Sequence, residues 1–126
     1  MSVQIKVDAE AVDLLYKYCK KSPAEIPPVL TRLLREWVKK TAYKWYQDPS
    51  LIPKMPDIPE SRMTSVGINH EWGKTFKNTI KKMNLKEGID IVEEKLASIL
   101  LVAYIKTYKV EEKGKWYRSK NWGSPG

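Results

Sequence analysis

The chain has 126 residues, and its 23 Lys and Arg exceed its 15 Asp and Glu, which gives a formal net charge of +8. This length predicts a single domain over residues 1–126 with a modest core. The basic excess favours a polyanionic partner or an anionic surface. One cysteine, Cys19, excludes an intramolecular disulfide and a cysteine-based zinc site.

The first residues alternate between polar and apolar and then become acidic, which is not the pattern of a signal peptide. The longest apolar run is well short of the ~20 residues that a membrane span requires. We therefore expect a virion or cytoplasmic protein that is neither secreted nor transmembrane. Many Lys and Glu beside only two Gln are typical of a thermophile.

Alternation over residues 2–7 predicts a short, half-buried N-terminal β-strand. Asp8 is then a suitable N-cap for a helix that runs to about Lys21. A second helix should begin near Ile26, because Pro27 and Pro28 are tolerated only in the first turn of a helix. We expect this helix to continue over residues 26–47.

Four prolines interrupt residues 48–66 and predict a stiff, extended crossover. A third helix is expected over Ile68 to Met83, where apolar residues recur at helical spacing, and Asn84 can cap its end. The fold class is therefore mainly α, with about four helices. Its expected parts are a strand and two basic helices (1–47), the crossover (48–66), a helical pair (67–109) and an extended, aromatic and basic tail (110–126).

The run from Ala97 to Ile105 contains a single polar residue, Ser98. We interpret it as the centre of a last helix, from about Gly88 to about Lys109, that is buried on most sides. A buried strand over residues 100–110 is the alternative, because short apolar runs are ambiguous. The surface around this run, together with tail aromatics, is the expected subunit interface, with Leu101, Tyr104, Ile105, Trp116 and Trp122 as its candidate residues.

Basic side chains follow the outer faces of the second and third predicted helices. Cations three or four residues apart on a helical face can follow a phosphate backbone without reading bases. We therefore predict contacts with double-stranded DNA along these two stripes. The candidate residues are Arg32, Arg35, Lys39 and Lys40 in one stripe and Lys74, Lys77, Lys81 and Lys82 in the other.

The residue patterns of common enzymes are not found in the sequence. His70 is the only histidine and has no second His or Cys ligand, so we expect no metal site. Cys19 lies on the apolar face of its predicted helix and is expected to be a buried structural thiol. There is neither a Gly-rich phosphate loop nor a nucleophile elbow, so we expect no catalytic residues, no cofactor and no small-molecule substrate.

The first forty residues resemble the ribbon-helix-helix family of DNA-binding regulators. The likeness lies in the strand VQIKV, the helix DAEAVDLLYKYCKK and the helix IPPVLTRLLREWVKK, in that order. In this family two strands pair across a dimer and enter the major groove. The resemblance implies a dimeric transcriptional regulator in which Gln4 and Lys6 face the bases.

The chain as a whole resembles the small, basic, helical coat proteins of filamentous archaeal viruses in composition and architecture. The shared features are a proline-broken basic N-terminal part, an apolar C-terminal helix and an aromatic tail. This resemblance implies a non-enzymatic subunit that self-associates and packages double-stranded DNA through its backbone, and it is our first interpretation. The regulator is the alternative, and a phage neck or tail-completion protein is a lesser one. A membrane-surface partner is not expected, because the tail predicts no strongly amphipathic helix.

Overall fold

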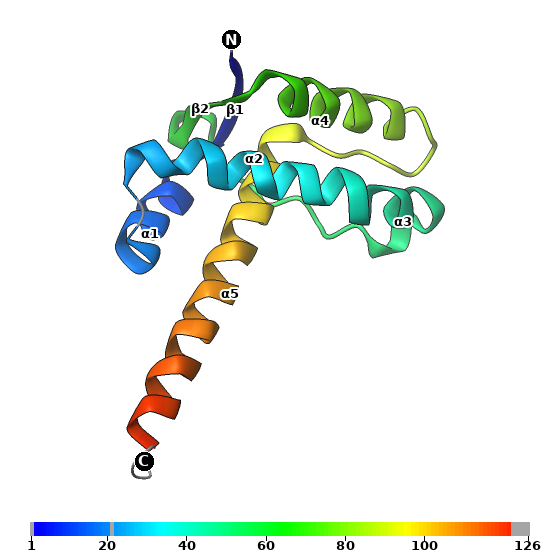
Figure 1. The fold of residues 1–126 in the computed structure, drawn as a ribbon. Coiled ribbons are helices and arrows are strands. Elements are labelled where there is room, and N and C mark those ends of the chain that lie inside the picture. The colour runs from blue at the N-terminus through cyan, green and yellow to red at the C-terminus, as the bar shows by residue number, and fades with distance from the viewer. Residues whose placement is uncertain (1, 21, 122–126) are drawn as a thin grey trace.

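The structure, a computed structural model, describes residues 2–20 and 22–121, with side chains as far as residue 108. It is mainly helical with a short strand pair, which confirms the expected fold class. The elements follow in the order β1 (Ser2–Asp8), α1 (Ala9–Cys19), α2 (Ile26–Glu36), a π-helical turn η2 (Trp37–Thr41), α3 (Ala42–Gln47), β2 (Met63–Asn69), α4 (His70–Met83) and α5 (Glu93–Asn121), with short 3-10 turns at Pro23–Glu25, Pro49–Leu51 and Glu60–Arg62 (Figure 1).

All of the predicted helices are present, with differences at their ends. The second helix covers the predicted span, although a π-helical turn divides it into α2 and α3. The first helix ends at Cys19 because Lys20 takes a left-handed backbone conformation with φ 52°. The apolar run is helical, not a strand, and α5 continues to Asn121 instead of ending near Lys109.

The strand β2 was not predicted from the sequence, which placed an extended crossover over its first half and a helix start over its last residues. It pairs with β1 in an antiparallel ladder that joins Ser2 to Asn69 and Asp8 to Met63. The third helix therefore begins at His70 instead of Ile68. The expected N-terminal strand is present, but its partner comes from the same chain and not from a second protomer.

The chain consists of two units with the same order of elements. The first unit is β1, α1 and α2, and the second unit is β2, α4 and α5. Asp8 at the end of β1 caps α1, and Asn69 at the end of β2 caps α4, each through a side-chain oxygen that accepts from a backbone N–H. The ladder is symmetric about the pair Ile5 and Val66. The two units are thus related by an approximate two-fold axis through the ribbon.

Each unit completes its core with the second helix of the other unit. α2 contacts β2 and α4, while α5 contacts β1 and α1, and α2 and α5 cross near the middle of the molecule (Figure 1). The same exchange is visible in two hydrogen bonds. The N–H of Asp8 donates to Oγ of Ser98 at 2.9 Å, and the N–H of Asn69 donates to Oγ1 of Thr31 at 3.3 Å. Thr31 and Ser98 therefore hold equivalent positions, and we call such residues counterparts.

The core lies between the ribbon and the helices and draws on both units. Leu34 and its counterpart Leu101 are both fully buried. Trp37 packs edge-on against Phe76 of α4, with ring centroids 5.5 Å apart, and this contact joins the two units. Among the described residues, the other large side chains that are fully buried are Phe76, Ile5, Val7, Leu15, Leu30, Ile68 and Leu96. Within the described part of the chain, no helix has the length and apolar character needed to cross a membrane.

Candidate nucleic-acid interface

One face of the ribbon is open to solvent and polar. Ile5, Val7, Val66 and Ile68 point inward and are buried, so the alternate residues point outward. The outward face carries Ser2, Gln4 and Lys6 from β1 and Ser65 and Gly67 from β2. The predicted base-reading residues Gln4 and Lys6 are thus exposed together on this face.

The longer side chains of the ribbon face, Gln4 and Lys6, each have a close neighbour. Gln4 lies beside Gly67, where an added Cβ would come within 3.2 Å of both the Gln4 Nε2 atom and the Ser2 Oγ atom. Nζ of Lys6 lies 2.8 Å from a carboxylate oxygen of Glu60, and this hydrogen bond raises the pKa of Lys6 above its ordinary value. Lys6 is therefore protonated at neutral pH, and its positive charge is paired with the carboxylate of Glu60.

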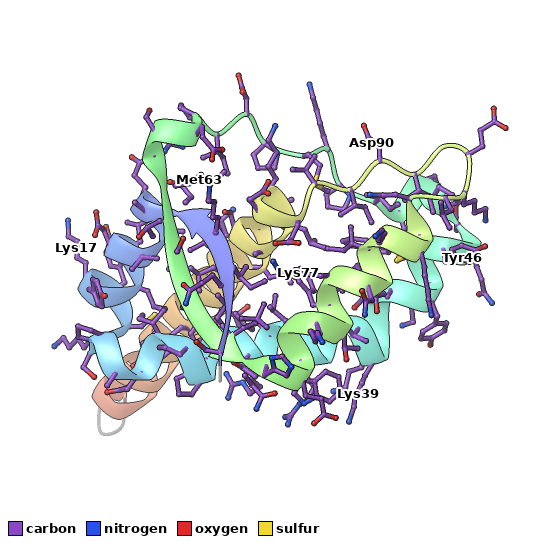
Figure 2. The ribbon with its side chains drawn as sticks, turned by 90° about the horizontal axis from the view of Figure 1, so that it is seen from above. Lys17, Lys39, Tyr46, Met63, Lys77 and Asp90 are labelled. Carbon is purple, nitrogen blue, oxygen red and sulfur yellow. The ribbon has the colours of Figure 1, made fainter. Side chains whose placement is uncertain are left out.

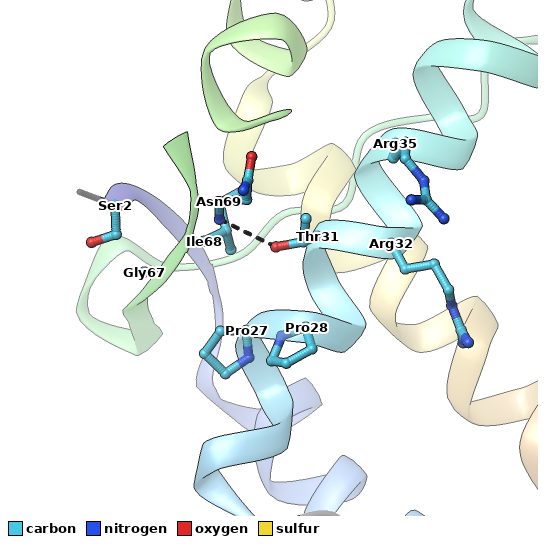
Figure 3. Close-up of a pocket in the computed structure, with 9 residues that line it drawn as sticks. All are labelled: Ser2, Pro27, Pro28, Thr31, Arg32, Arg35, Gly67, Ile68 and Asn69. Atoms are coloured by element: carbon cyan, nitrogen blue, oxygen red, sulfur yellow. Dashed lines mark hydrogen bonds between the residues drawn. The ribbon is translucent and has the colours of Figure 1, made fainter. Parts of the chain in front are cut away.

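A groove of about 490 Å³ lies where the end of the ribbon meets α2, and Figure 3 shows its lining. Hydroxyl groups of Ser2 and Thr31 and the side-chain amide of Asn69 supply polar groups, and Arg32 and Arg35 lie along its α2 side. The remaining lining residues are Pro27, Pro28, Gly67 and Ile68. Pro27 and Pro28 carry no backbone N–H, so anion binding here depends on side chains.

A row of cations continues from this groove along the outer side of α2 and η2. Arg32, Arg35 and Lys39 are exposed and follow one another at helical spacing, and we call them the α2 ridge. Aromatic rings support two of its members, because the Arg32 guanidinium lies 5.5 Å from the ring centroid of Tyr104 and Nζ of Lys39 lies 5.3 Å from that of Trp72. Lys40 instead lines a neighbouring groove between η2 and α5.

The basic stripe of α4 does not join the α2 ridge. Nζ of Lys77 lies 3.5 Å from a carboxylate oxygen of Glu93 at the start of α5. Figure 2 shows Lys39 and Lys77 on opposite sides of α4. Lys74 and Lys81 lie one turn to either side of Lys77 on the same helical face and are exposed. Lys82 is exposed as well, so the two predicted stripes form separate surfaces.

The predicted subunit interface requires a correction. Leu101 is 0% exposed and Ile105 is 4% exposed, because α2, α1 and β1 of the same chain cover this side of α5. Neither residue is available to another subunit, and the half-buried Tyr104 lies beneath Arg32. Trp116 belongs to the part of α5 whose side chains are not described, and Trp122 lies outside the described residues.

Sequence reasoning missed the contributions of β2 to this surface. Val66 and Ile68 alternate with Ser65 and Gly67, and Asn69 follows as a suitable N-cap, which is the same pattern as in β1. That signal was present, although short. Thr31 gave no signal, because its place in the groove depends on how α2 crosses β2.

The chain matches no described family model, and no curated protein or solved structure is significantly similar to it. The function must therefore be argued from the geometry of this surface. Its parts are a polar ribbon face, a groove with three polar side chains and a cationic ridge, and the shared residues of the groove make them continuous.

Proposed function

We propose that the protein binds double-stranded DNA without catalysing a reaction, and that it does so as a regulator of the ribbon-helix-helix type contained in one chain. The observation that carries this proposal is the outward polar face of the ribbon beside the α2 ridge. The major groove of B-DNA is wide enough to admit a two-stranded β-ribbon. On this proposal the ribbon face enters the groove and the ridge follows the adjacent phosphates.

The duplicated architecture supports this choice over the other candidates. In ribbon-helix-helix proteins each of two chains supplies one strand and two helices, with the strands paired between the chains. Here the first and second units supply the same elements, and their strands pair within one chain. The proposal therefore extends the resemblance from the first forty residues to the whole described chain.

The side chains of the ribbon face are suited to contacts with bases, and those of the α2 ridge are suited to contacts with phosphates. The Gln4 amide can donate and accept, which is the pattern that adenine presents in the major groove, and Lys6 can donate to guanine. Ser65 and Gly67 are small and allow the ribbon to approach the base edges closely. Arg32, Arg35 and Lys39 supply the positive charge that positions a protein on the phosphate backbone.

A virion coat or DNA-packaging subunit that self-associates is the second candidate. It is favoured by the separate basic surface of α4, because cations on opposite sides of α4 can contact two duplexes. The C-terminal part of α5 extends beyond the other elements (Figure 1) and provides a projection that a neighbouring subunit can contact. Such a subunit would bind unrelated duplexes equally well and form large assemblies.

Salt-titrated binding distinguishes the two candidates. A regulator should prefer a duplex selected from a random library over unrelated duplexes by at least about a thousandfold. A packaging subunit should show no such preference, and light scattering should detect large particles. Failure of the wild-type protein to bind any duplex at low salt contradicts both.

The α2 ridge is tested by the double substitution Arg32→Ala with Arg35→Ala. Each phosphate contact contributes about −0.9 to the slope of log K against log salt concentration, so this variant should lower the magnitude of the slope by about 2. The matched control is Lys74→Ala with Lys81→Ala, which removes the same charge from the face of α4. If the control lowers the slope as much as the ridge variant does, the proposed surface is wrong.

A further inference from the structure

We infer that the two halves of this pseudo-dimer are unequal as DNA-binding surfaces, so that one chain binds a non-palindromic site whose phosphates it contacts mainly on the α2 side. The inference rests on the proposed function and adds the symmetry and stoichiometry of the complex to it. It comes from a comparison of counterparts across the approximate two-fold axis.

Two of the three counterparts of the α2 ridge are uncharged. Because Thr31 corresponds to Ser98, Arg32 corresponds to Ile99 and Arg35 corresponds to Val102. The fully buried pair Leu34 and Leu101 fits this same alignment. Where the first unit presents two guanidinium groups, the second unit therefore presents two aliphatic side chains. Lys39 alone has a cationic counterpart, Lys106.

The counterpart of the arginine-lined groove is also different. This second groove, of about 390 Å³, is lined by Ile99, Val102 and Lys106 of α5 and by the crossover residues Pro56, Asp57 and Ile58. The crossover thus lies against the side of the second unit that corresponds to the ligand groove of the first. Its exposed Asp57 places a negative charge where a phosphate would have to approach.

The one arginine in the second groove is already engaged. Nε of Arg62 lies 2.9 Å from a carboxylate oxygen of Asp8, and Nη1 lies 2.9 Å from one of Glu10. Nη2 donates to the other oxygen of Asp8 at 3.1 Å. A guanidinium held by two carboxylates has few donors left for a phosphate. The charge of Arg62 is thus neutralised within the second groove, and the crossover lines one side of that groove.

The ribbon face has the same asymmetry. In the symmetric ladder Gln4 corresponds to Ser65 and Lys6 corresponds to Gly67, so both long polar side chains come from β1. Identical chains in a two-fold dimer read half-sites of the same sequence, which makes their sites palindromic. Two unlike halves have no such constraint. The preferred site should therefore lack two-fold symmetry.

Selection of duplexes from a random library by the full-length wild-type chain tests this directly. We expect one non-palindromic sequence, bound by one chain as measured by native mass spectrometry. Phosphate ethylation should interfere with binding mainly on one flank of the site. A palindromic site bound by two chains, or equal interference on both flanks, would overturn the inference while leaving DNA binding itself intact.

Two variants that change one charge each test which flank of the DNA site lies against the second groove. Asp57→Lys should raise the affinity severalfold at low salt and create interference on the second flank, because it replaces a repelling carboxylate there with a cation. Asp13→Lys makes the same charge change on the exposed side of α1 and is the matched control. Equal gains from both variants would indicate a general charge effect and overturn the assignment. Absence of wild-type binding to every duplex would instead contradict the proposed function.

Discussion

Ser98 interrupts the apolar run of α5 because the backbone of Asp8 needs an acceptor inside the core. Its hydroxyl accepts from the N–H of Asp8 at 2.9 Å and donates to the carbonyl oxygen of Glu94 at 2.7 Å. Its exposed fraction is 2%. A single polar residue in an apolar helix is therefore the point at which α5 is fixed to β1.

We expect Ser98→Ala to lower the free energy of unfolding by about 1–3 kcal/mol, because it leaves the buried N–H of Asp8 without an acceptor. Urea denaturation followed by circular dichroism measures this. Thr107→Ala is the control, since the Thr107 hydroxyl is exposed and donates to the carbonyl oxygen of Ala103 one turn earlier in the same helix. A loss no larger than that of the control would show that the hydrogen bond to Asp8 does not matter.

At the scale of elements, the packing of α4 on β1 depends on Gly73. A Cβ at this position would lie 2.7 Å from Cβ of Val3 and 3.3 Å from Cγ1 of Ile68. The helix can therefore approach the ribbon closely only without a side chain here. The counterpart residue in α1, Val12, is buried with its full side chain, so the two units pack their first helices at different depths.

Gly73→Ala should accordingly destabilise the fold by about 1–3 kcal/mol, although Ala is the better helix former by about 1 kcal/mol. Adding Val3→Gly removes the Cβ atom that clashes and should recover part of this loss in a double-mutant cycle. Asn78→Ala, on the exposed face of the same helix, should change stability little. If Gly73→Ala proves neutral or stabilising, the close approach of Gly73 to Val3 does not determine how α4 packs on β1.

The helices were predictable from the sequence because each has a local signal. Asp8 marks the start of α1, Pro27 and Pro28 mark the start of α2, and the apolar run of α5 is long enough to indicate burial. The strand β2 was missed because its alternation covers few residues and contains Gly67. The partners that fix it as a strand lie in β1, far away in the sequence.

The candidate site was predictable in its residues but not in its assembly. The sequence indicated Gln4 and Lys6 on one surface and Arg32, Arg35 and Lys39 on another. Only the crossing of α2 over β2 brings them together. The burial of Leu101 and Ile105 was not foreseen as a contact within the chain, because the exchange of helices between the units is a property of tertiary structure.

At the scale of the whole molecule, the two units should hold together without the covalent crossover. Lys54 is exposed, and a protease site inserted beside it should allow cleavage without loss of structure. We expect the two fragments to elute together in size-exclusion chromatography, because α2 and α5 each pack on the other unit. The midpoint of urea unfolding should become dependent on protein concentration after cleavage.

The uncleaved protein with the inserted site is the control and should show no concentration dependence. Separation of the fragments under native conditions would mean that the exchanged helices contribute less than the connection between the units. It would also mean that each unit keeps enough apolar contact of its own to remain soluble.

The pairing of β1 with β2 also sets an order of events during synthesis. β1 is synthesised well before its ladder partner β2, and the helix that covers it, α5, follows later still. Contacts between segments so distant in sequence form slowly, so the edges of β1 stay unpaired at least until β2 has been synthesised. On a polysome, β1 of one nascent chain can meet the second unit of a neighbouring nascent chain before its own second unit has been made. Pairing of that kind gives a domain-swapped dimer, which is the characteristic folding error that we expect of this fold.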